Sequence, residues 1–345
     1  MSSPLLFNSL FSYIGGKRKL AHKILSYAEG EIFIDAFAGA CSVGLLAKHL
    51  KKSVISNDTA QRSYISQLAL IENCTEKMGE DDIARLFVLV KNDGFVEKTY
   101  CPKFFTREVA RFLDNAFAVI KSIENVHKQA LLQHLLIVYM LKIRSFSRFG
   151  LTKDSQAIDA GKASEILEIA TRSRATKMLQ TMSHPFTILL EISKDINRAI
   201  VNTGKECRAS NLDVFEFLEQ VEGNSVYFDP PYSGSSSYEN TYAVLDSILE
   251  GREIKLPTSV FNRKDAEKFF HKMYEASEHI PVWLTSMGKN EDSAGTTFDG
   301  DELLKVVKEH RPNSKLVTFK HRWAINTMAG KDQKDNIEYL IISRK

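Results

Sequence analysis

The segment 31–52 constrains the fold most, because its pattern is a buried strand, a glycine-rich turn and a helix in direct succession. Glu31–Phe37 is a short apolar run, and Ser42–Lys52 has the spacing of a helix that is capped by Ser42. A second short strand, Ser53–Ser56, follows the helix at once and ends at Asn57-Asp58. Short apolar strands that alternate with helices are typical of a parallel sheet covered on both faces.

This alternation stops at Thr59 and resumes at Glu206. The residues between show helical patterns only, at Tyr64–Asn73, Asp81–Asn92, Arg107–Ser122, Val126–Arg144, Ala163–Met178 and Ile188–Asn202. Five more strands follow, at Glu206–Ser210, Ser225–Phe228, Ile280–Ser286, Lys315–Lys320 and Ile337–Ser343. The sequence therefore predicts an α/β chain in which residues 1–58 and 206–345 build a seven-stranded sheet and residues 59–205 form a helical insertion.

The insertion carries the excess positive charge of the chain. It has 21 Lys and Arg residues against 16 Asp and Glu residues, while the whole chain has a formal net charge of +3. At the end of one predicted helix, cations and aromatic rings alternate in Lys142–Gly150. One interpretation is that Arg144 and Arg148 bind DNA phosphates. The other is an ordinary cationic helix end that complements the helix dipole.

Several classes of protein are disfavoured by composition. The longest apolar runs, such as Leu135–Leu141, are far shorter than the roughly 18 residues that a membrane span needs. Met1–Leu10 has no basic region ahead of its apolar stretch, as a signal peptide would. The four cysteines are scattered, without a CxxC pair or a histidine at metal-ligand spacing. We expect a cytoplasmic protein without membrane association, structural metal or disulfides.

The turn after the first strand is similar to a nucleotide-binding loop. Gly39-Ala40-Cys41-Ser42-Val43-Gly44 nearly matches the GxGxxG fingerprint, and Asp58 lies where an acidic residue binds a ribose. Cys41 replaces the glycine that lets the backbone approach a pyrophosphate. The loop therefore suits a cofactor that has an adenosine but no phosphates, such as S-adenosyl-L-methionine. The alternative is a tight strand-to-helix turn without a ligand.

A second turn, Asp229-Pro230-Pro231-Tyr232, follows directly from the strand Ser225–Phe228. Two prolines cannot continue a strand ladder, so they fix a rigid turn at the sheet edge where ligands bind in open α/β folds. The aspartate carboxylate and a proline carbonyl can accept both hydrogens of an exocyclic amine, while the tyrosine ring stacks on its heterocycle. The alternative is a rigid surface turn with a packed tyrosine.

With this tetrapeptide the chain resembles the Dam-like family of adenine-N6 DNA methyltransferases. The similarity covers most of Leu5–Tyr242 in order, through Tyr13-Ile14-Gly15-Gly16-Lys17, Phe33–Val43, Ser56-Asn57-Asp58, Asn211-Leu212-Asp213-Val214 and Asp229–Tyr232. It implies a Rossmann-like methyltransferase sheet with an inserted helical target-recognition domain, S-adenosyl-L-methionine as cofactor, double-stranded DNA as substrate, and no metal. It also implies methyl transfer to the N6 amine of a flipped adenine.

The resemblance assigns residues to three roles. The residues implied at the cofactor are Tyr13, Lys17, Asp35, Phe37, Ala38, Gly39, Asp58, Asp213 and Val214. The catalytic residues are Asp229, Pro230, Pro231 and Tyr232, and the DNA contacts expected in the insertion are Arg144 and Arg148. A restriction endonuclease that acts on the same site is a further expected partner.

Two other functions stay open at this point. The N4 amine of cytosine is chemically similar to the N6 amine of adenine, and a DNA-binding protein on a degenerate scaffold would explain Cys41 without catalysis. After the tetrapeptide, we expect Ser233–Ser237 to be a mobile loop. We further expect Tyr238 and Tyr242 to close over the base pocket.

Overall fold

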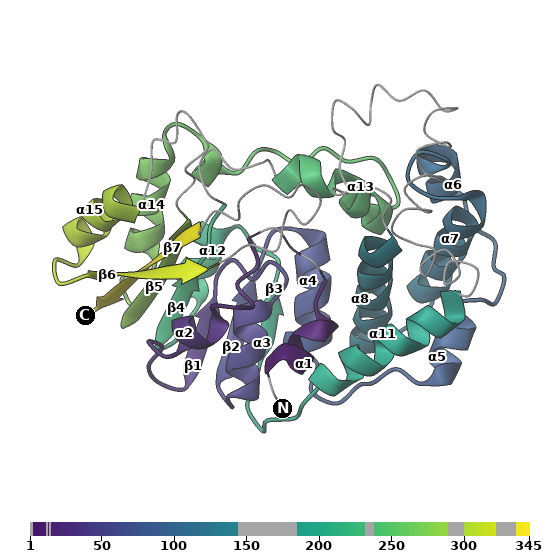
Figure 1. Cartoon of the computed structure of the whole chain (residues 1–345), viewed down its shortest axis with the longest axis horizontal. Helices are drawn as coiled ribbons and strands as arrows, with labels where there is room; N and C mark the ends of the chain where they lie inside the picture. The colour runs from purple at the N-terminus through teal and green to yellow at the C-terminus, as the bar shows by residue number, and fades with distance from the viewer. Residues whose placement is uncertain are drawn as a thin grey trace.

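The computed structural model describes residues 3–11, 13, 15–143, 185–231, 238–288, 300–321 and 336–345. Its centre is a seven-stranded sheet (Figure 1) with the strand order β3-β2-β1-β4-β5-β7-β6. The strands are β1 (Ile32–Asp35), β2 (Ser53–Asn57), β3 (Arg208–Ser210), β4 (Ser225–Phe228), β5 (Val282–Gly288), β6 (Lys315–His321) and β7 (Asn336–Arg344). The first five strands in this order, β3, β2, β1, β4 and β5, pair in parallel, whereas β7 is antiparallel to both β5 and β6. All seven predicted strands are confirmed, each to within two residues at its ends.

Side chains alternate between the two faces of the sheet, as the period of a strand requires. Phe33 of β1 and Tyr227 of β4 belong to one apolar core, while their neighbours Ile34 and Phe228 belong to the other. Since both faces are apolar, both must be covered by helices.

Different parts of the chain cover the two faces. The core of the first face includes residues of α1 (Ser3–Leu6), η1 (Phe7–Ser9), α2 (Ala21–Leu25), α3 (Ser42–His49) and α13 (Tyr238–Glu250). The helical segment shares this core through α4 (Gln61–Gln67), η2 (Leu68–Glu72), α5 (Glu80–Arg85), α6 (Phe95–Tyr100), α7 (Arg107–Lys121), α8 (Val126–Ile143) and α11 (Pro185–Ala199). The second face is covered by α12 (Val214–Gln220), η3 (Val260–Asn262), α14 (Ala266–Ala276) and α15 (Gly300–His310). Within the described part of the chain, no helix is long and apolar enough to cross a membrane.

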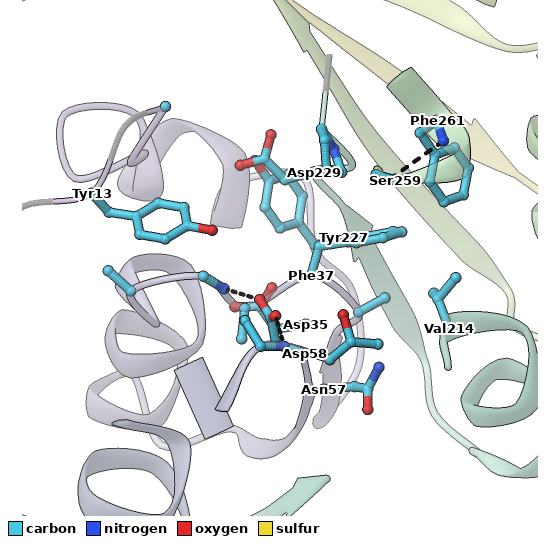
Figure 2. Close-up of a pocket in the computed structure, with 18 of the residues that line it drawn as sticks. Tyr13, Asp35, Phe37, Asn57, Asp58, Val214, Tyr227, Asp229, Ser259 and Phe261 are labelled. Carbon is cyan, nitrogen blue, oxygen red and sulfur yellow. Dashed lines mark hydrogen bonds between the residues drawn. The ribbon is translucent and has the colours of Figure 1, made fainter. Parts of the chain in front are cut away.

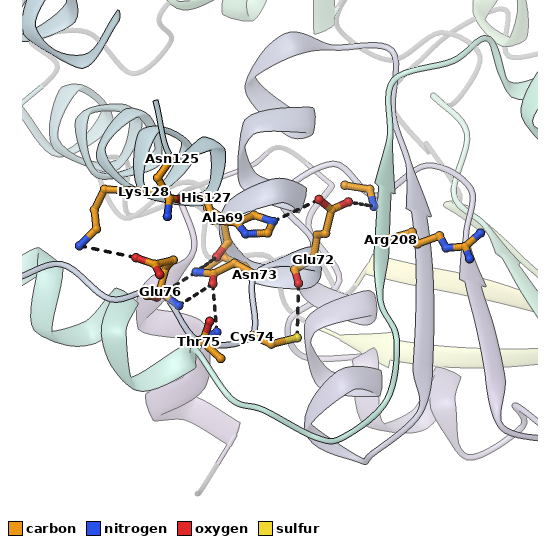
Figure 3. A network of polar contacts seen from close by, with 12 residues as sticks. Ala69, Glu72, Asn73, Cys74, Thr75, Glu76, Asn125, His127, Lys128 and Arg208 are labelled. Carbon is orange, nitrogen blue, oxygen red and sulfur yellow. Dashed lines mark hydrogen bonds and ion pairs between the residues drawn. The ribbon is translucent and has the colours of Figure 1, made fainter. Parts of the chain in front are cut away.

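Polar contacts at the end of η2 join the helical segment to the sheet (Figure 3). Glu72 Oε2 accepts the backbone N–H of Ala209 in β3 at 2.9 Å, and Glu72 Oε1 lies 3.1 Å from His127 Nε2 in α8. One carboxylate therefore ties α8 to an edge strand. On the same helix, Lys128 Nζ lies 2.8 Å from Asp82 Oδ2. The charge of this lysine therefore pairs with a carboxylate of the helical segment itself.

A buried histidine also connects α8 to the amino-terminal segment. His134 is fully buried, with Nε2 2.8 Å from the Ser9 carbonyl and Nδ1 2.9 Å from Ser66 Oγ. Burial lowers the pKa of His134 to about 4, so the ring is neutral at physiological pH. Its role is therefore in packing α8 against η1 and α4.

Three predicted elements differ from the structure or lie beyond it. The helix expected at Asp81–Asn92 ends at Arg85, because the buried Asn115 side chain donates to the carbonyls of Leu86 and Val88 and accepts the N–H of Val90. These bonds hold the chain in a non-helical conformation. Tyr238, expected to close over the base pocket, is the first residue of helix α13. The helix predicted at Ala163–Met178 lies outside the described residues.

Candidate active site

A pocket of about 370 Å³ lies at the carboxyl ends of β1, β2 and β4 (Figure 2). This volume is within the range of about 300–1,000 Å³ that is usual for small-molecule sites. All the predicted cofactor residues line it: Tyr13, Lys17, Asp35, Phe37, Ala38, Gly39, Asp58, Asp213 and Val214. Asp229 and Pro231 of the tetrapeptide line it as well, and Pro230 is buried between them. Tyr232, Arg144 and Arg148 lie outside the described residues.

The loop after β1 has left-handed backbone conformations at two positions. Gly39 has a φ of +52° and Cys41 a φ of +62°, which is a strained conformation for a side chain with a Cβ. Cys41 is fully buried in the core of the first face and does not line the pocket. The side chain that replaces the fingerprint glycine therefore points away from the space that a ligand would fill.

Asp58 is held by the backbone on both sides of its carboxylate. Its Oδ2 accepts the N–H of Gly39 at 2.8 Å, and its Oδ1 accepts the N–H of Ala60 at 2.9 Å. Burial raises the pKa of Asp58 above its usual value, against the opposing effect of these hydrogen bonds. The carboxylate is thus oriented before any ligand binds, and each oxygen keeps one lone pair for a hydroxyl group.

Asn57 fixes the next wall of the pocket. Its Oδ1 accepts the N–H of Leu212 at 2.9 Å, and its Nδ2 donates to the Leu212 carbonyl at 3.1 Å. The following residue, Asp213, caps α12 by accepting the N–H of Phe215 at 3.0 Å. This role of Asn57 was not predicted from the sequence, although an amide directly before the acidic residue at a strand end is a usable signal.

Lys17 lines the pocket and lies between two carboxylates. Its ammonium is 2.9 Å from Asp229 Oδ1 and 3.2 Å from Glu338 Oε1, and it donates to the Gly15 carbonyl at 2.8 Å. Burial by itself would lower the pKa of Lys17, but the two carboxylates raise it above its usual value. The group of three carries one net negative charge. Glu338 was not predicted as a site residue. The signal that could have identified it is a single acidic residue inside the largely apolar strand β7.

Two aromatic rings and an arginine close the amino-terminal side. Tyr13 and Tyr242 stack with ring centroids 5.3 Å apart, and the Arg62 guanidinium lies 4.3 Å from the Tyr242 ring. Arg62 also forms a buried ion pair with Asp246 of α13. Tyr242 is only 2% exposed, so the expectation that it belongs to a mobile cover is wrong. Tyr242 instead packs against Tyr13 and Arg62, which line the pocket, and supports both of them. The loop Ser233–Ser237 lies outside the described residues.

The opposite wall comes from a segment without a sequence signal. Residues 256–261 and Arg263 line the pocket, and Phe261 meets the Phe37 ring edge-on at 5.5 Å. At the floor, Asp35 Oδ2 accepts the N–H of Gly44, while Oδ1 has no hydrogen-bond partner among the described residues. Burial raises the pKa of Asp35 to about 7. The pocket therefore offers an aromatic end, a carboxylate floor and a second end near Tyr13.

Residues 13–292 match the family model of the D12 class N6 adenine-specific DNA methyltransferases. The chain belongs to this family. The resemblance and the methyltransferase fold expected from the sequence are thereby confirmed. This methyltransferase is an enzyme that methylates the N6 amine of adenine in DNA, so the N4-cytosine and degenerate-scaffold alternatives are not supported.

Proteins that are named as methyltransferases or modification methylases match much of the chain. The type II methyltransferase M2.HphI of Haemophilus parahaemolyticus is 31% identical over 96% of this chain and 97% of its own length. The type II methyltransferase M.NlaIII of Neisseria lactamica is 26% identical over 69% of this chain and 68% of its own. The modification methylase LlaI of Lactococcus lactis subsp. lactis is 26% identical over 73% of this chain, a match that covers 42% of that protein.

Proposed function

We propose that this methyltransferase takes its methyl group from S-adenosyl-L-methionine and transfers it to an adenine that is flipped out of double-stranded DNA. The observation that carries the proposal is the position of Asp58 and Asp229 in one pocket, at the ends of two strands on either side of β1. Ligands bind at this edge in open α/β folds. When bound, the cofactor supplies an electrophilic methyl group on a sulfonium centre.

The side chains of the pocket fit such a molecule. Phe37 and Phe261 offer apolar surface for an adenine ring, and Asp213 lies beside them as an acceptor for its amine. Asp58 presents a fixed carboxylate to the two hydroxyls of a ribose. Asp35 Oδ1, buried and without a partner among the described residues, is an acceptor for a donor group of the amino-acid portion. Tyr13 marks the end of the pocket for that portion.

Asp229 and its neighbours act on the target amine. We propose that the Asp229 carboxylate and the Pro230 carbonyl accept the two hydrogens of the N6 amine, while Tyr232 stacks on the base. This arrangement directs the nitrogen lone pair toward the methyl group, and positioning then accounts for much of the rate. Lys17 supports the step because its ion pair holds Asp229 in place.

Replacement of Asp229 by alanine tests the assignment. We expect Asp229→Ala to abolish transfer of labelled methyl groups to DNA, while its circular dichroism spectrum and its binding of S-adenosyl-L-homocysteine persist. The exposed Asp93 offers a matched control, and Asp93→Ala should keep full activity. Full activity of Asp229→Ala would refute the catalytic role. Absence of cofactor heat in calorimetry with the wild type would refute the cofactor.

We further propose that residues 59–205 select the DNA target, with residues 1–58 and 206–345 as the catalytic domain. The excess of five positive charges in the helical segment favours DNA binding, and such binding weakens with salt through counterion release. Arg148→Ala, and likewise Arg144→Ala, should weaken DNA binding and lower its salt dependence while cofactor affinity stays unchanged. Equal loss of DNA and cofactor binding would identify a structural arginine instead.

The names of the relatives suggest a biological setting. M2.HphI is named a type II methyltransferase and LlaI a modification methylase. We propose that this chain protects cytoplasmic DNA from a restriction endonuclease that acts on the same site. Sequencing of modified bases in DNA from cells that express the protein gives the site. The same DNA should then resist the cognate nuclease, and sensitivity despite complete methylation would refute the partnership.

A further inference from the structure

Three cations line the pocket among the residues that the structure describes: Lys17, Arg62 and Arg263. Lys17 is already shared by Asp229 and Glu338, so a third carboxylate near it would meet a net negative charge. Arg263 is exposed and belongs to the wall that carries Phe261. Figure 2 shows Tyr13 and Phe261 on opposite sides of the pocket. Neither Lys17 nor Arg263 is therefore suited to an anion at the Tyr13 end.

Arg62 differs from both. It is 3% exposed, lines the pocket, and its guanidinium lies 5.8 Å from the centre of the Tyr13 ring. Asp246 is bonded through Nη1, whereas Nε has no hydrogen-bond partner among the described residues. A guanidinium has five N–H donors, and a buried donor without a partner is costly. Asp246 is ion-paired with Arg62 and the Asp58 carboxylate also interacts with its charge, yet the buried Nε still has an N–H to donate.

We propose that Arg62 binds the α-carboxylate of the amino-acid portion of the methyl donor, and that Asp246 positions Arg62 for this contact. This inference rests on the proposed cofactor. Asp246 belongs to α13, the helix that follows the catalytic turn in the sequence. The same contact therefore connects the cofactor to this helix. Arg62 is thus a specificity residue that separates the intact amino acid from analogues that lack the carboxylate.

Calorimetry with two ligands tests the inference without any turnover. The probes are S-adenosyl-L-homocysteine and its decarboxylated counterpart, which differ only in the carboxylate. Wild type should prefer the first by at least about tenfold, as hydrogen bonds to charged groups lead us to expect. Arg62→Gln should lose this preference, and Arg263→Gln, the matched control on the opposite wall, should keep it.

A second variant tests the inference in case Arg62→Gln does not fold. Arg62→Met combined with Asp246→Leu replaces the buried ion pair by apolar side chains, a change that is often neutral for stability. It should fold, bind the decarboxylated ligand as wild type does, and show no preference. Persistence of the preference in either Arg62 variant, or its loss in Arg263→Gln, would overturn the inference. If wild type binds neither ligand, the cofactor proposal fails and this inference fails with it.

Discussion

Lys17 Nζ lies 2.9 Å from Asp229 Oδ1, so an ammonium group from the amino-terminal segment holds the carboxylate of the turn that follows β4. The cation is 4% exposed, and its second partner, Glu338, is 1% exposed. In such surroundings the charges are poorly screened by water, and each depends on the others. The geometry of the turn therefore depends on three segments that are far apart in sequence: the one before α2, the end of β4, and β7.

Removal of the shared cation should be costly. We expect Lys17→Met to destabilise the protein by about 3–5 kcal/mol, because it removes the buried ammonium group that pairs with the half-buried Asp229 and the buried Glu338. Urea denaturation measures this loss. Lys194→Met, which removes a cation from an exposed i,i+3 pair with Glu191, should leave the denaturation midpoint unchanged. Similar midpoints for both variants would contradict the buried ion group.

Loss of the Asn57 amide should weaken cofactor binding. Asn57→Ala leaves the backbone of Leu212 without two partners, at a cost of about 1–3 kcal/mol in stability. The turn that carries Asp213 then moves, and a loss of roughly 1.4 kcal/mol in binding would appear as a tenfold weaker affinity in calorimetry. Asn202→Ala, at an exposed turn, serves as the control. Unchanged affinity in Asn57→Ala would show that Asp213 does not contribute to the cofactor site.

The fingerprint glycine should be restorable at Cys41 without a change in cofactor affinity. A left-handed residue with a Cβ costs roughly 1–2 kcal/mol, which Cys41→Gly relieves. It also loses buried surface worth about 1 kcal/mol, so the net change in stability should be small. Cys41→Val should destabilise clearly, since a β-branched side chain tolerates this conformation poorly. Weaker cofactor binding by Cys41→Gly would mean that the thiol side of the loop contacts the ligand.

Acidification should destabilise the fold through His134. Burial lowers its folded pKa to about 4, whereas an unfolded histidine titrates near 6.5. Between these values the unfolded chain binds a proton that the folded chain does not. The free energy of unfolding therefore decreases as the pH is lowered from about 6.5 to about 4, by about 3 kcal/mol in total. His134→Gln should lack this part of the pH dependence. Identical slopes of unfolding free energy against pH in both proteins would refute the assignment.

Local patterns were sufficient to predict the sheet. Strands β1 and β4 are short and apolar, and the turns after Asp35 and Phe228 have the residue types that their geometry requires. The pocket residues that precede or end these elements could therefore be placed by number. The helical segment was harder, since Asn115 overrides the helical periodicity of residues 86–90 through contacts that no local pattern contains.

The remainder of the site depends on contacts between distant residues. Glu338 reaches Lys17 only because β7 enters the sheet beside β5, and Arg62 faces the pocket only because α13 supplies Asp246. The wall at residues 256–261 has neither a strong strand pattern nor a motif. The spacing of residues in the sequence does not reveal contacts between such distant residues. It does predict the relative positions of residues that are joined by one strand and one turn.

The strand order has a consequence for synthesis of the protein. Lys17 and Asp229 leave the ribosome before Glu338, which follows Asp229 by roughly 110 residues, or about 5–20 s at ordinary rates of elongation. Until β7 enters between β5 and β6, the nascent chain lacks the third member of the ion group and an intact sheet. We therefore expect methylating activity only after β7 has joined the sheet, so that a nascent chain that lacks β7 leaves the surrounding DNA unmodified.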